Sequence, residues 1–219
     1  MAEITILVPV LSRPGNVRPL VESIRATSDA DILFLGSPNF RDEEQAILEV
    51  GCDLMVTPRQ SKGDYARKIN HGLRATDTPY VFLGADDIRF HPGWQEATLG
   101  AIAPDGICGT DDMGSPRVVA GEHSTHTLVS RLYAQEVGVL GQIKEPLSVL
   151  CELYWHEFVD DELVNTAKFM NRWAFADGAK VEHLHPNWGK AKPDPIYFEQ
   201  RSRFRAGKLI YKKREYLWT

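Results

Sequence analysis

Two adjacent carboxylates, Asp86 and Asp87, follow a short apolar run from Tyr80 to Leu83 and precede a Pro-Gly turn. The run predicts a buried strand, and α/β sheets bind ligands at the carboxyl ends of their strands. Adjacent carboxylates repel each other unless one turns to water or a cation lies between them. A solvated loop is the structural alternative. We expect Asp86 and Asp87 to belong to a divalent-metal site that holds a diphosphate.

A second acidic run, residues 158–163, contains Asp160 and Asp161. A carboxylate within hydrogen-bond reach of a hydroxyl group can accept its proton as a general base. The structural alternative is a helix start, where one aspartate is the N-cap and others favour the first turn. Both can hold together, because one carboxylate can cap the helix while its neighbour faces the site.

Two histidines, His183 and His185, lie in an extended stretch that we predict over residues 174–185. Carboxylate oxygens suit Mg²⁺ or Mn²⁺, and an added imidazole favours Mn²⁺. If this stretch is extended, we expect the two imidazole rings to face opposite ways, so that one of them binds the metal. The sequence leaves open which one, and a structural or surface histidine is the alternative for each.

Strands and helices alternate along the first hundred residues. Amphipathic or apolar patterns predict strands at 4–10, 31–35, 53–57 and 80–84, with helices at 17–26, 41–50 and 63–75. This alternation predicts an α/β domain with a mostly parallel central sheet and helices on both faces. Later patterns are looser: we expect a strand at 107–110, an edge hairpin or strand pair over 117–130, and helices at 131–138 and 161–173.

Composition limits the classes of function. The chain has 219 residues, 43% of them apolar and 25% charged, and a net charge of −5, so no global basic field attracts nucleic acid. No apolar run reaches the roughly 18 residues of a membrane span. The amino terminus does not have the pattern of a signal peptide. Three widely spaced cysteines are typical of reduced thiols, so we expect a cytoplasmic protein of unknown oligomeric state.

Four segments in order resemble family 2 glycosyltransferases. Residues 4–14 are similar to the opening strand and loop of that family, and residues 63–73 with 80–87 are similar to the segment that carries its metal motif. Residues 158–163 resemble the acidic acceptor-side motif, and Val181-Glu182-His183 resembles the closing Val-x-His. The resemblance covers most of residues 4–185.

The resemblance implies a GT-A (Rossmann-like) domain over residues 1–196, with a nucleotide-binding half at about 1–100 and an acceptor-binding half at about 101–196. It implies a metal-dependent transfer of sugar from a nucleoside diphosphate sugar, with Mn²⁺ or Mg²⁺ as cofactor. The acceptor, whether glycan, protein, small molecule or modified DNA, stays open. A carboxylate base without an opposing nucleophile would imply inversion at the anomeric carbon.

Some site residues are implied by their position in the family motifs, and others are expected because they lie next to those motifs in the sequence. Asp160 is the first candidate for the general base because it aligns with the aspartate of the acidic motif, and Asp161 is the second. Metal ligands are expected among Asp86, Asp87, His183 and His185. Donor-binding residues are expected to be Pro9, Leu11, Arg13, Lys68, Asn70, Gly84, Ala85 and Lys190, and acceptor-binding residues Trp155, Glu157 and Trp94.

The chain also departs from the family pattern. The first aspartate of the metal motif is Gly84, and the second strand ends on Gly36-Ser37 instead of an acidic pair. Two alternatives therefore stay open, a nucleotidylyltransferase and a non-catalytic module that binds a sugar nucleotide or glycan. The loop at residues 12–15 disfavours the first, because it is not the glycine-rich basic loop that holds a triphosphate.

The carboxyl-terminal residues 197–219 mix basic and aromatic side chains, with seven Lys or Arg and two Glu. We expect a helical tail packed across the domain with a solvated basic face. The functional alternative is a lid over an anionic donor or a contact for an anionic acceptor, including nucleic acid.

Overall fold

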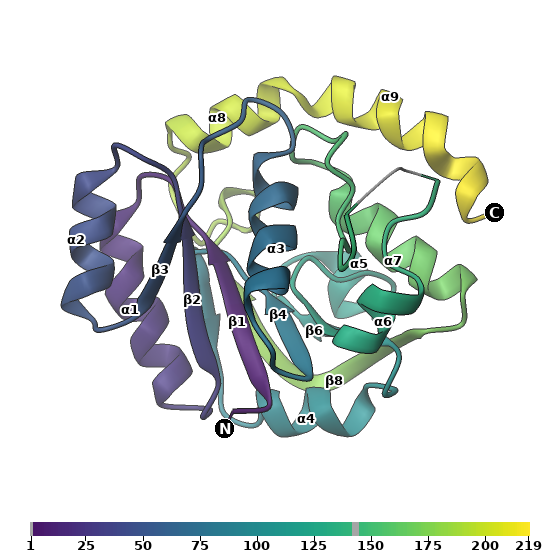
Figure 1. The fold of residues 1–219 in the computed structure, drawn as a ribbon, viewed down its shortest axis with the longest axis horizontal. Helices are drawn as coiled ribbons and strands as arrows, with labels where there is room; N and C mark the ends of the chain where they lie inside the picture. Colours follow the sequence, from purple (N-terminus) through teal and green to yellow (C-terminus); the bar gives the residue numbers. More distant parts are fainter. Residues whose placement is uncertain (1, 142–144) are drawn as a thin grey trace.

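The computed structural model describes residues 2–141 and 145–219 of the chain. Within these residues one curled sheet runs through the molecule, in the strand order β3-β2-β1-β4-β7-β6-β8-β5 (Figure 1). The strands are β1 (Ile4–Pro9), β2 (Asp31–Gly36), β3 (Asp53–Val56), β4 (Tyr80–Leu83), β5 (Ile88–Phe90), β6 (Ile107–Asp111), β7 (Thr127–Ser130) and β8 (Trp173–His183). The α-helices are α1 (Pro14–Arg25), α2 (Arg41–Glu49), α3 (Asp64–Ala75), α4 (Trp94–Ala101), α5 (Pro116–Val119), α6 (Arg131–Glu136), α7 (Val159–Phe169), α8 (Pro195–Ser202) and α9 (Phe204–Arg214).

The amino-terminal half of the sheet is parallel, as predicted. Strand β1 pairs with β2 and β4, and β2 pairs with β3. The residues of β1 from Ile4 to Val8 are all buried, because a central parallel strand is covered on both faces and must be apolar throughout. The parallel order brings the carboxyl ends of β1 and β4 to one edge, where the loops that follow them begin the site.

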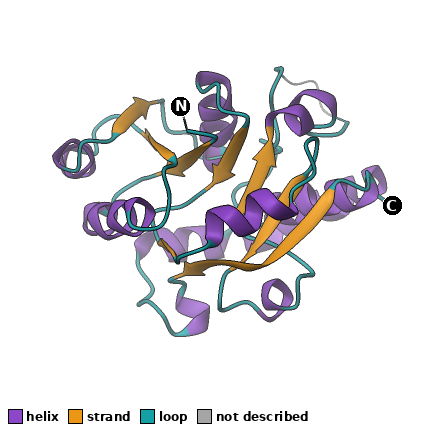
Figure 2. Ribbon diagram, turned by 90° about the horizontal axis from the view of Figure 1, so that it is seen from below, coloured by secondary structure: helices purple, strands orange, loops and turns teal. Residues whose placement is uncertain are grey.

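Helices cover both faces of the sheet, which confirms the predicted layering (Figure 2). Helix α1 buries Val17, Leu20, Val21 and Ile24 in a core shared with Phe82 and Trp94 on one face. On the other face α3, α6 and α7 pack around a second core that includes Ile69, Tyr133 and Leu163. The 3.6-residue spacing of apolar positions in α1 and α3 explains why each helix buries one stripe.

The edge hairpin or strand pair predicted over residues 117–130 is wrong. Pro116 instead begins the short helix α5, because proline is well suited to the first helical turn. Only Thr127–Ser130 form a strand, and this strand β7 lies in the middle of the sheet, antiparallel to β4 and β6. All four of its residues are buried, which an edge position would not require.

Strand β8 is the longest element of the sheet and links its centre to its edge. It runs parallel to β6, with a register shift between Thr110 and Asp111, and then pairs antiparallel with β5. Neither β5 nor helix α4 was predicted. In the β5–β8 register His183 lies opposite Ile88, and the Leu184 amide donates to the Asp87 carbonyl at 2.8 Å. The register therefore brings the histidine segment beside the two aspartates.

The predicted helical tail is present as α8 and α9, which run along the top of the molecule in Figure 1. The end of α9 is fixed by Arg214, whose Nε and Nη2 donate to the Glu162 carboxylate of α7 at 2.8 and 2.6 Å. The Tyr154 hydroxyl donates to the same carboxylate at 2.8 Å. Glu162 is 3% exposed and Arg214 8% exposed, so this ion pair is shielded from solvent.

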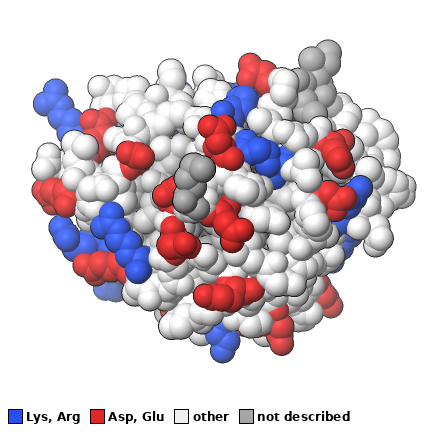
Figure 3. All heavy atoms as spheres, turned by 60° about the horizontal axis from the view of Figure 1, so that its bottom comes forward, with Lys and Arg blue, Asp and Glu red and all other residues white. Residues whose placement is uncertain are grey.

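The charged side chains on the surface agree with the net negative charge of the chain. Figure 3 shows acidic side chains spread across one face, with basic ones between them, in line with the net charge of −5. Among the described residues, no helix combines the length and the apolar character that crossing a membrane requires. No disulfide bond joins Cys52, Cys108 and Cys151 in the described part of the chain.

We predict that Arg214→Ala destabilises the domain by about 3–5 kcal/mol, because it leaves the Glu162 carboxylate buried without its charge partner. Urea unfolding followed by circular dichroism measures the change. Lys213→Ala, at an exposed neighbouring position, is the matched control and should change the unfolding free energy by less than about 0.5 kcal/mol. Equal unfolding curves for the two variants would contradict the assigned role of the pair.

Candidate active site

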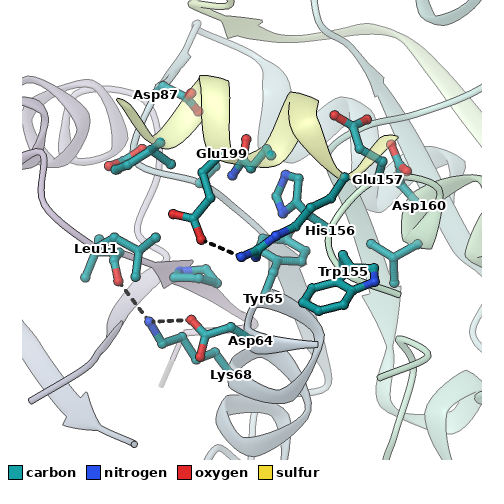
Figure 4. Close-up of a pocket in the computed structure, with 18 of the residues that line it drawn as sticks. Leu11, Asp64, Tyr65, Lys68, Asp87, Trp155, His156, Glu157, Asp160 and Glu199 are labelled. Carbon is teal, nitrogen blue, oxygen red and sulfur yellow. Dashed lines mark hydrogen bonds and ion pairs between the residues drawn. The ribbon is translucent and has the colours of Figure 1, made fainter. Parts of the chain in front are cut away.

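Loops that follow β1, β4 and β8 meet at one pocket at the carboxyl edge of the parallel strands. Arg13 comes from the β1–α1 loop, Asp86 and Asp87 from the β4–β5 loop, and His183 from the end of β8. All four line the pocket. Figure 4 shows Lys68 and Asp64 of α3 on one side of the pocket, and Trp155, Glu157 and Asp160 on the other.

The guanidinium group of Arg13 lies between the two aspartates. Its Nη1 is 3.1 Å from Asp86 Oδ1 and 3.1 Å from Asp87 Oδ2. The opposite edge of the guanidinium donates to Asp194, with Nε 2.6 Å from Oδ2 and Nη2 3.2 Å from Oδ1. From the sequence we expected either a carboxylate turned to water or a cation between the two, and in the structure an arginine of the chain lies there.

The two aspartates differ in pKa because their charged neighbours differ. Burial, and then the neighbouring charge of Asp87, raise the pKa of Asp86 to about 7. Burial alone would also raise the pKa of Asp87, but hydrogen bonding and charge from His183, with the charge of Arg13, hold that pKa well below its ordinary value. Asp87 is therefore the carboxylate that stays ionised throughout the neutral range.

Of the two candidate histidines, His183 is the one beside an aspartate. Its Nε2 is 3.6 Å from Asp87 Oδ1. The Nδ1 atom of His185 instead accepts a hydrogen bond from the Asn187 amide at 3.2 Å, where it caps a short 3₁₀ turn (Pro186–Trp188). The two rings lie 4.9 Å apart and both line the pocket. The expectation that they face opposite ways is therefore wrong, because residues two apart in an extended chain lie on the same face.

These residues fit a divalent cation. Asp86 and Asp87 each direct an oxygen at the same atom, Arg13 Nη1, so a small cation there would face two hard carboxylate oxygens. An imidazole nitrogen stands close to the second carboxylate, and such mixed oxygen and nitrogen sets are typical of Mn²⁺. Among the described residues, the group of three potential ligands whose atoms all lie within 4.8 Å of one another is a different one, His123, Asp160 and Asp161, and the atoms of Asp86, Asp87 and His183 are less compactly placed.

Asp160 and Asp161 lie in the first turn of α7, but only Asp160 lines the pocket. Asp160 Oδ2 is 3.2 Å from His123 Nε2, and Oδ1 accepts the Asp161 amide at 3.0 Å. Asp161 turns to Arg117, 3.0 Å away. Burial would raise the pKa of Asp160, but the hydrogen bond and charge of His123 lower it below the ordinary value. The N-cap of α7 is Phe158, without a side-chain cap, so the expected capping role of either aspartate is wrong. Both lie instead in the first turn, where the helix dipole favours acidic residues, and Asp160 is also part of the pocket wall.

The donor side contains five of the eight residues expected there. Pro9, Leu11, Arg13, Lys68 and Ala85 line the pocket. Lys68 is 1% exposed, and its Nζ donates to the Val10 carbonyl at 2.9 Å and lies 3.3 Å from Asp64. This contact ties α3 to the end of β1.

The other three expected donor residues lie outside the pocket lining. Asn70 is fully buried and holds a loop instead, donating to the Leu150 carbonyl at 2.9 Å and accepting the Val149 amide at 3.0 Å. Lys190 pairs with Glu182 at 2.8 Å. Gly84 packs on β1, and a Cβ there would lie 2.9 Å from the Leu7 carbonyl oxygen. This approach explains why an aspartate is absent at that position.

On the acceptor side, Trp155 and Glu157 line the pocket but Trp94 does not. Trp94 is 0% exposed, and its ring packs against Phe90 and Phe82 with centroids 4.6 and 5.3 Å away. Its expected acceptor role is therefore wrong, because the Pro-Gly turn starts α4 and directs the indole into the core. Burial, and then the charge of Asp160, raise the pKa of Glu157 to about 7.

Several pocket residues were missed by the sequence argument. The polar loop after β3 and helix α8 both line the pocket, and Asp194 lies at its margin against Arg13. The position of residues 59–61 after a parallel strand was a usable signal, since that edge binds ligands. Helix α8 overlaps the basic and aromatic segment 197–219, for which a lid over an anionic donor was the functional alternative. The residues missed in the lining include Arg59, Gln60, Ser61, Tyr65, His126, His156, Glu199 and Arg203.

No protein-family model matches the sequence, and no curated protein matches it significantly. Solved structures do match. Glucosyl-3-phosphoglycerate synthase from Mycobacterium tuberculosis, in complex with Mn²⁺, uridine diphosphate and phosphoglyceric acid, has a TM-score of 0.61 at 15% identity, over 94% of this chain and 77% of that one. A mannosyltransferase from Pyrobaculum calidifontis, in complex with GDP-Man and Mn²⁺, has a TM-score of 0.65 at 15% identity, over 97% and 64%.

The protein has the GT-A fold. At this level of identity the likeness establishes the GT-A architecture, and the chemistry of this GT-A domain must be argued from its own residues.

Three sets of contacts hold α8 and the start of α9 over the pocket of the GT-A domain. Arg13 binds Asp194, Arg59 Nη2 is 3.1 Å from Glu199 Oε2, and Arg203 donates to the Ser61 carbonyl at 3.0 Å. The Arg203 guanidinium also lies 4.7 Å from the centroid of the Trp155 ring. The contacts of Arg13 with Asp194, Arg59 with Glu199 and Arg203 with Ser61 each join residues that are more than 100 positions apart.

We predict that Asp194→Asn speeds hydrogen exchange of the α8 amides roughly fivefold, the effect of about 1 kcal/mol for a partly exposed ion pair. The asparagine retains the N-cap acceptor for the Tyr197 amide, so the variant isolates the loss of charge toward Arg13. Mass spectrometry after deuterium labelling measures the exchange. Lys192→Gln, at an exposed site on the same segment, is the control, and equal exchange in both variants would count against the Arg13 contact.

Proposed function

We propose that this protein is a metal-dependent glycosyltransferase that moves a sugar from a nucleoside diphosphate sugar to an acceptor hydroxyl group. One observation carries the proposal: Asp86, Asp87 and His183 converge at the pocket of a GT-A domain, with a positive group already between the carboxylates. Structures with this fold include complexes with Mn²⁺, with Mg²⁺ and with UDP or GDP-Man. The family 2 resemblance of the sequence agrees with it.

Asp86, Asp87 and His183 are the residues that would hold Mn²⁺ or Mg²⁺. A bound cation of this kind supplies Lewis-acid stabilisation to a departing diphosphate. The chain itself supplies Arg13, whose guanidinium can bind two phosphate oxygens at once. Were a cation bound to the two aspartates, Arg13 Nη1 would no longer be needed between them, and the guanidinium could bind a diphosphate, which its geometry matches.

The donor nucleotide is assigned to the half of the pocket built by residues 1–100. Pro9 and Leu11 offer apolar contacts at the end of β1, and Lys68 fixes that end through the Val10 carbonyl. The acceptor is assigned to the half built by residues 101–196, where Trp155 and Glu157 stand beside Asp160. The flat indole is suited to stacking on a sugar ring.

Asp160 is the proposed general base. Its carboxylate faces the pocket and its lowered pKa keeps it ionised at neutral pH, so it can accept the proton of an attacking hydroxyl group. Asp161 is turned to Arg117 outside the pocket, which makes it the weaker candidate. A base on the acceptor side, with direct attack on the anomeric carbon, corresponds to inversion of configuration.

We predict that Asp86→Ala weakens Mn²⁺-dependent binding of the nucleoside diphosphate by at least about 10–100-fold. A thermal-shift panel of nucleoside diphosphates with and without Mn²⁺ identifies the nucleotide, and calorimetry measures its affinity. Asp53→Ala, at an exposed position on β3, is the control. Unchanged metal-dependent affinity in Asp86→Ala would remove the metal assignment.

We predict that Asp160→Asn retains the nucleotide affinity but lowers the transfer rate by about 10²–10⁴-fold, the usual contribution of a general base. Hydrolysis or transfer of the sugar from the same donor provides the rate. Asp161→Asn should lower it far less. Pyrophosphate release from a nucleoside triphosphate would instead identify a nucleotidylyltransferase, and nucleotide binding without turnover of any donor would identify a binding module.

A further inference from the structure

His123 stands behind the proposed base, away from the pocket. It lies in the loop between α5 and β7 and is 6% exposed. Its Nε2 is 3.2 Å from Asp160 Oδ2, while the pocket lining includes Asp160 but not His123. A ligand in the pocket would therefore meet the carboxylate and never the imidazole.

In the described part of the chain, the His123 imidazole has one hydrogen-bond partner, the Asp160 carboxylate. Its Nδ1 is buried and has no hydrogen-bond partner among the described residues. A buried nitrogen without a partner costs stability, and the ring is nevertheless held with Nε2 toward Asp160. The contact with the carboxylate is thus the interaction that fixes the orientation of the ring.

Each carboxylate oxygen of Asp160 has a hydrogen-bond partner that does not line the pocket. Oδ2 faces His123, and Oδ1 accepts the Asp161 amide at 3.0 Å in the first turn of α7, where the helix dipole favours a negative charge. Other titratable or charged groups act on this pair from neighbouring elements. They are Asp161, Arg117, His156, Glu157, Tyr65 and His126.

We propose that His123 is a positioning residue for Asp160, which fixes the carboxylate in the orientation that faces the acceptor and keeps it ionised. This inference rests on the proposed function. In the reaction the O–H bond of the acceptor breaks and its proton passes to Asp160 Oδ1. The acceptor oxygen bonds to the anomeric carbon, and the bond to the diphosphate breaks with its electron pair. Nε2–H of His123 continues to donate to Oδ2 throughout, so His123 exchanges no proton.

The protonation states of His123 and Asp160 must then depend on each other. The Asp160 carboxylate raises the pKa of His123 although burial opposes this, and His123 in turn lowers the pKa of Asp160. Without His123 the pKa of Asp160 rises. Transfer requires the ionised Asp160 carboxylate. When the solution is acidified, a variant without His123 therefore loses its transfer rate at a higher pH than the native protein does.

The first test needs no activity. In the native protein and in Asp160→Asn, the His123 ring is titrated by heteronuclear NMR, and its assignment comes from the loss of its signal in His123→Gln. We expect a lower pKa for His123 in Asp160→Asn than in the native protein. An equal pKa in both proteins would overturn the proposal, whether or not the protein transfers sugar.

The second test uses the pH dependence of transfer. We expect His123→Gln to shift the acidic limb of the kcat profile to higher pH and to lower kcat by up to roughly 100-fold, the cost of a misplacement on the order of 1 Å, with the donor KM unchanged. His71→Gln is the matched control. A native pH profile in folded His123→Gln would refute the positioning role, whereas absence of transfer in the native protein would refute the proposed function itself.

The third test separates positioning from metal binding, since His123, Asp160 and Asp161 have potential ligand atoms within 4.8 Å of one another. Zn²⁺ and Mn²⁺ are titrated into Asp86→Ala, which lacks a ligand of the proposed metal site. We expect His123 signals to be unaffected at metal concentrations that saturate the native protein. Their specific shift or broadening would identify a metal site and overturn the proposal.

Discussion

The repulsion between two adjacent carboxylates constrains this protein more than any other interaction. Asp86 and Asp87 are both shielded from water, and two such charges raise each other's energy unless positive groups offset them. The offset comes from distant parts of the chain, Arg13 after β1 and His183 at the end of β8. The fold must bring these segments together, and Asp194 then balances the remaining charge of Arg13.

The direction of strand β8 meets this requirement. Because β7 is antiparallel to both β4 and β6, and β8 is parallel to β6, strand β8 runs in the same direction as β4 and ends with His183 at the same edge of the sheet. Strand β7 reverses direction beside β4, and β8 passes from β6 to β5 through an irregular register. The same arrangement places the start of α7, with Asp160, across the pocket from the end of β1.

The carboxyl-terminal helices join the two halves of the pocket. Helix α8 contributes Glu199 to the lining next to Arg59, and Arg203 at its end stacks on Trp155. The far end of α9 is held by the buried pair of Arg214 and Glu162. The segment thus has a firm anchor at one end and partly exposed ion pairs over the pocket, which is the distribution of stability expected of an element that moves on ligand binding.

The sequence by itself determined the parallel half of the sheet, because continuous apolar runs and 3.6-residue stripes are local patterns that report burial directly. It also determined that Asp86 and Asp87 needed either a cation between them or one side chain turned to water, since that follows from their adjacency alone. Only the tertiary structure decided which group lies between them, that His183 rather than His185 approaches Asp87, and that Trp94 is in the core. These outcomes depend on strand register and long-range packing, which spacing along the chain does not encode.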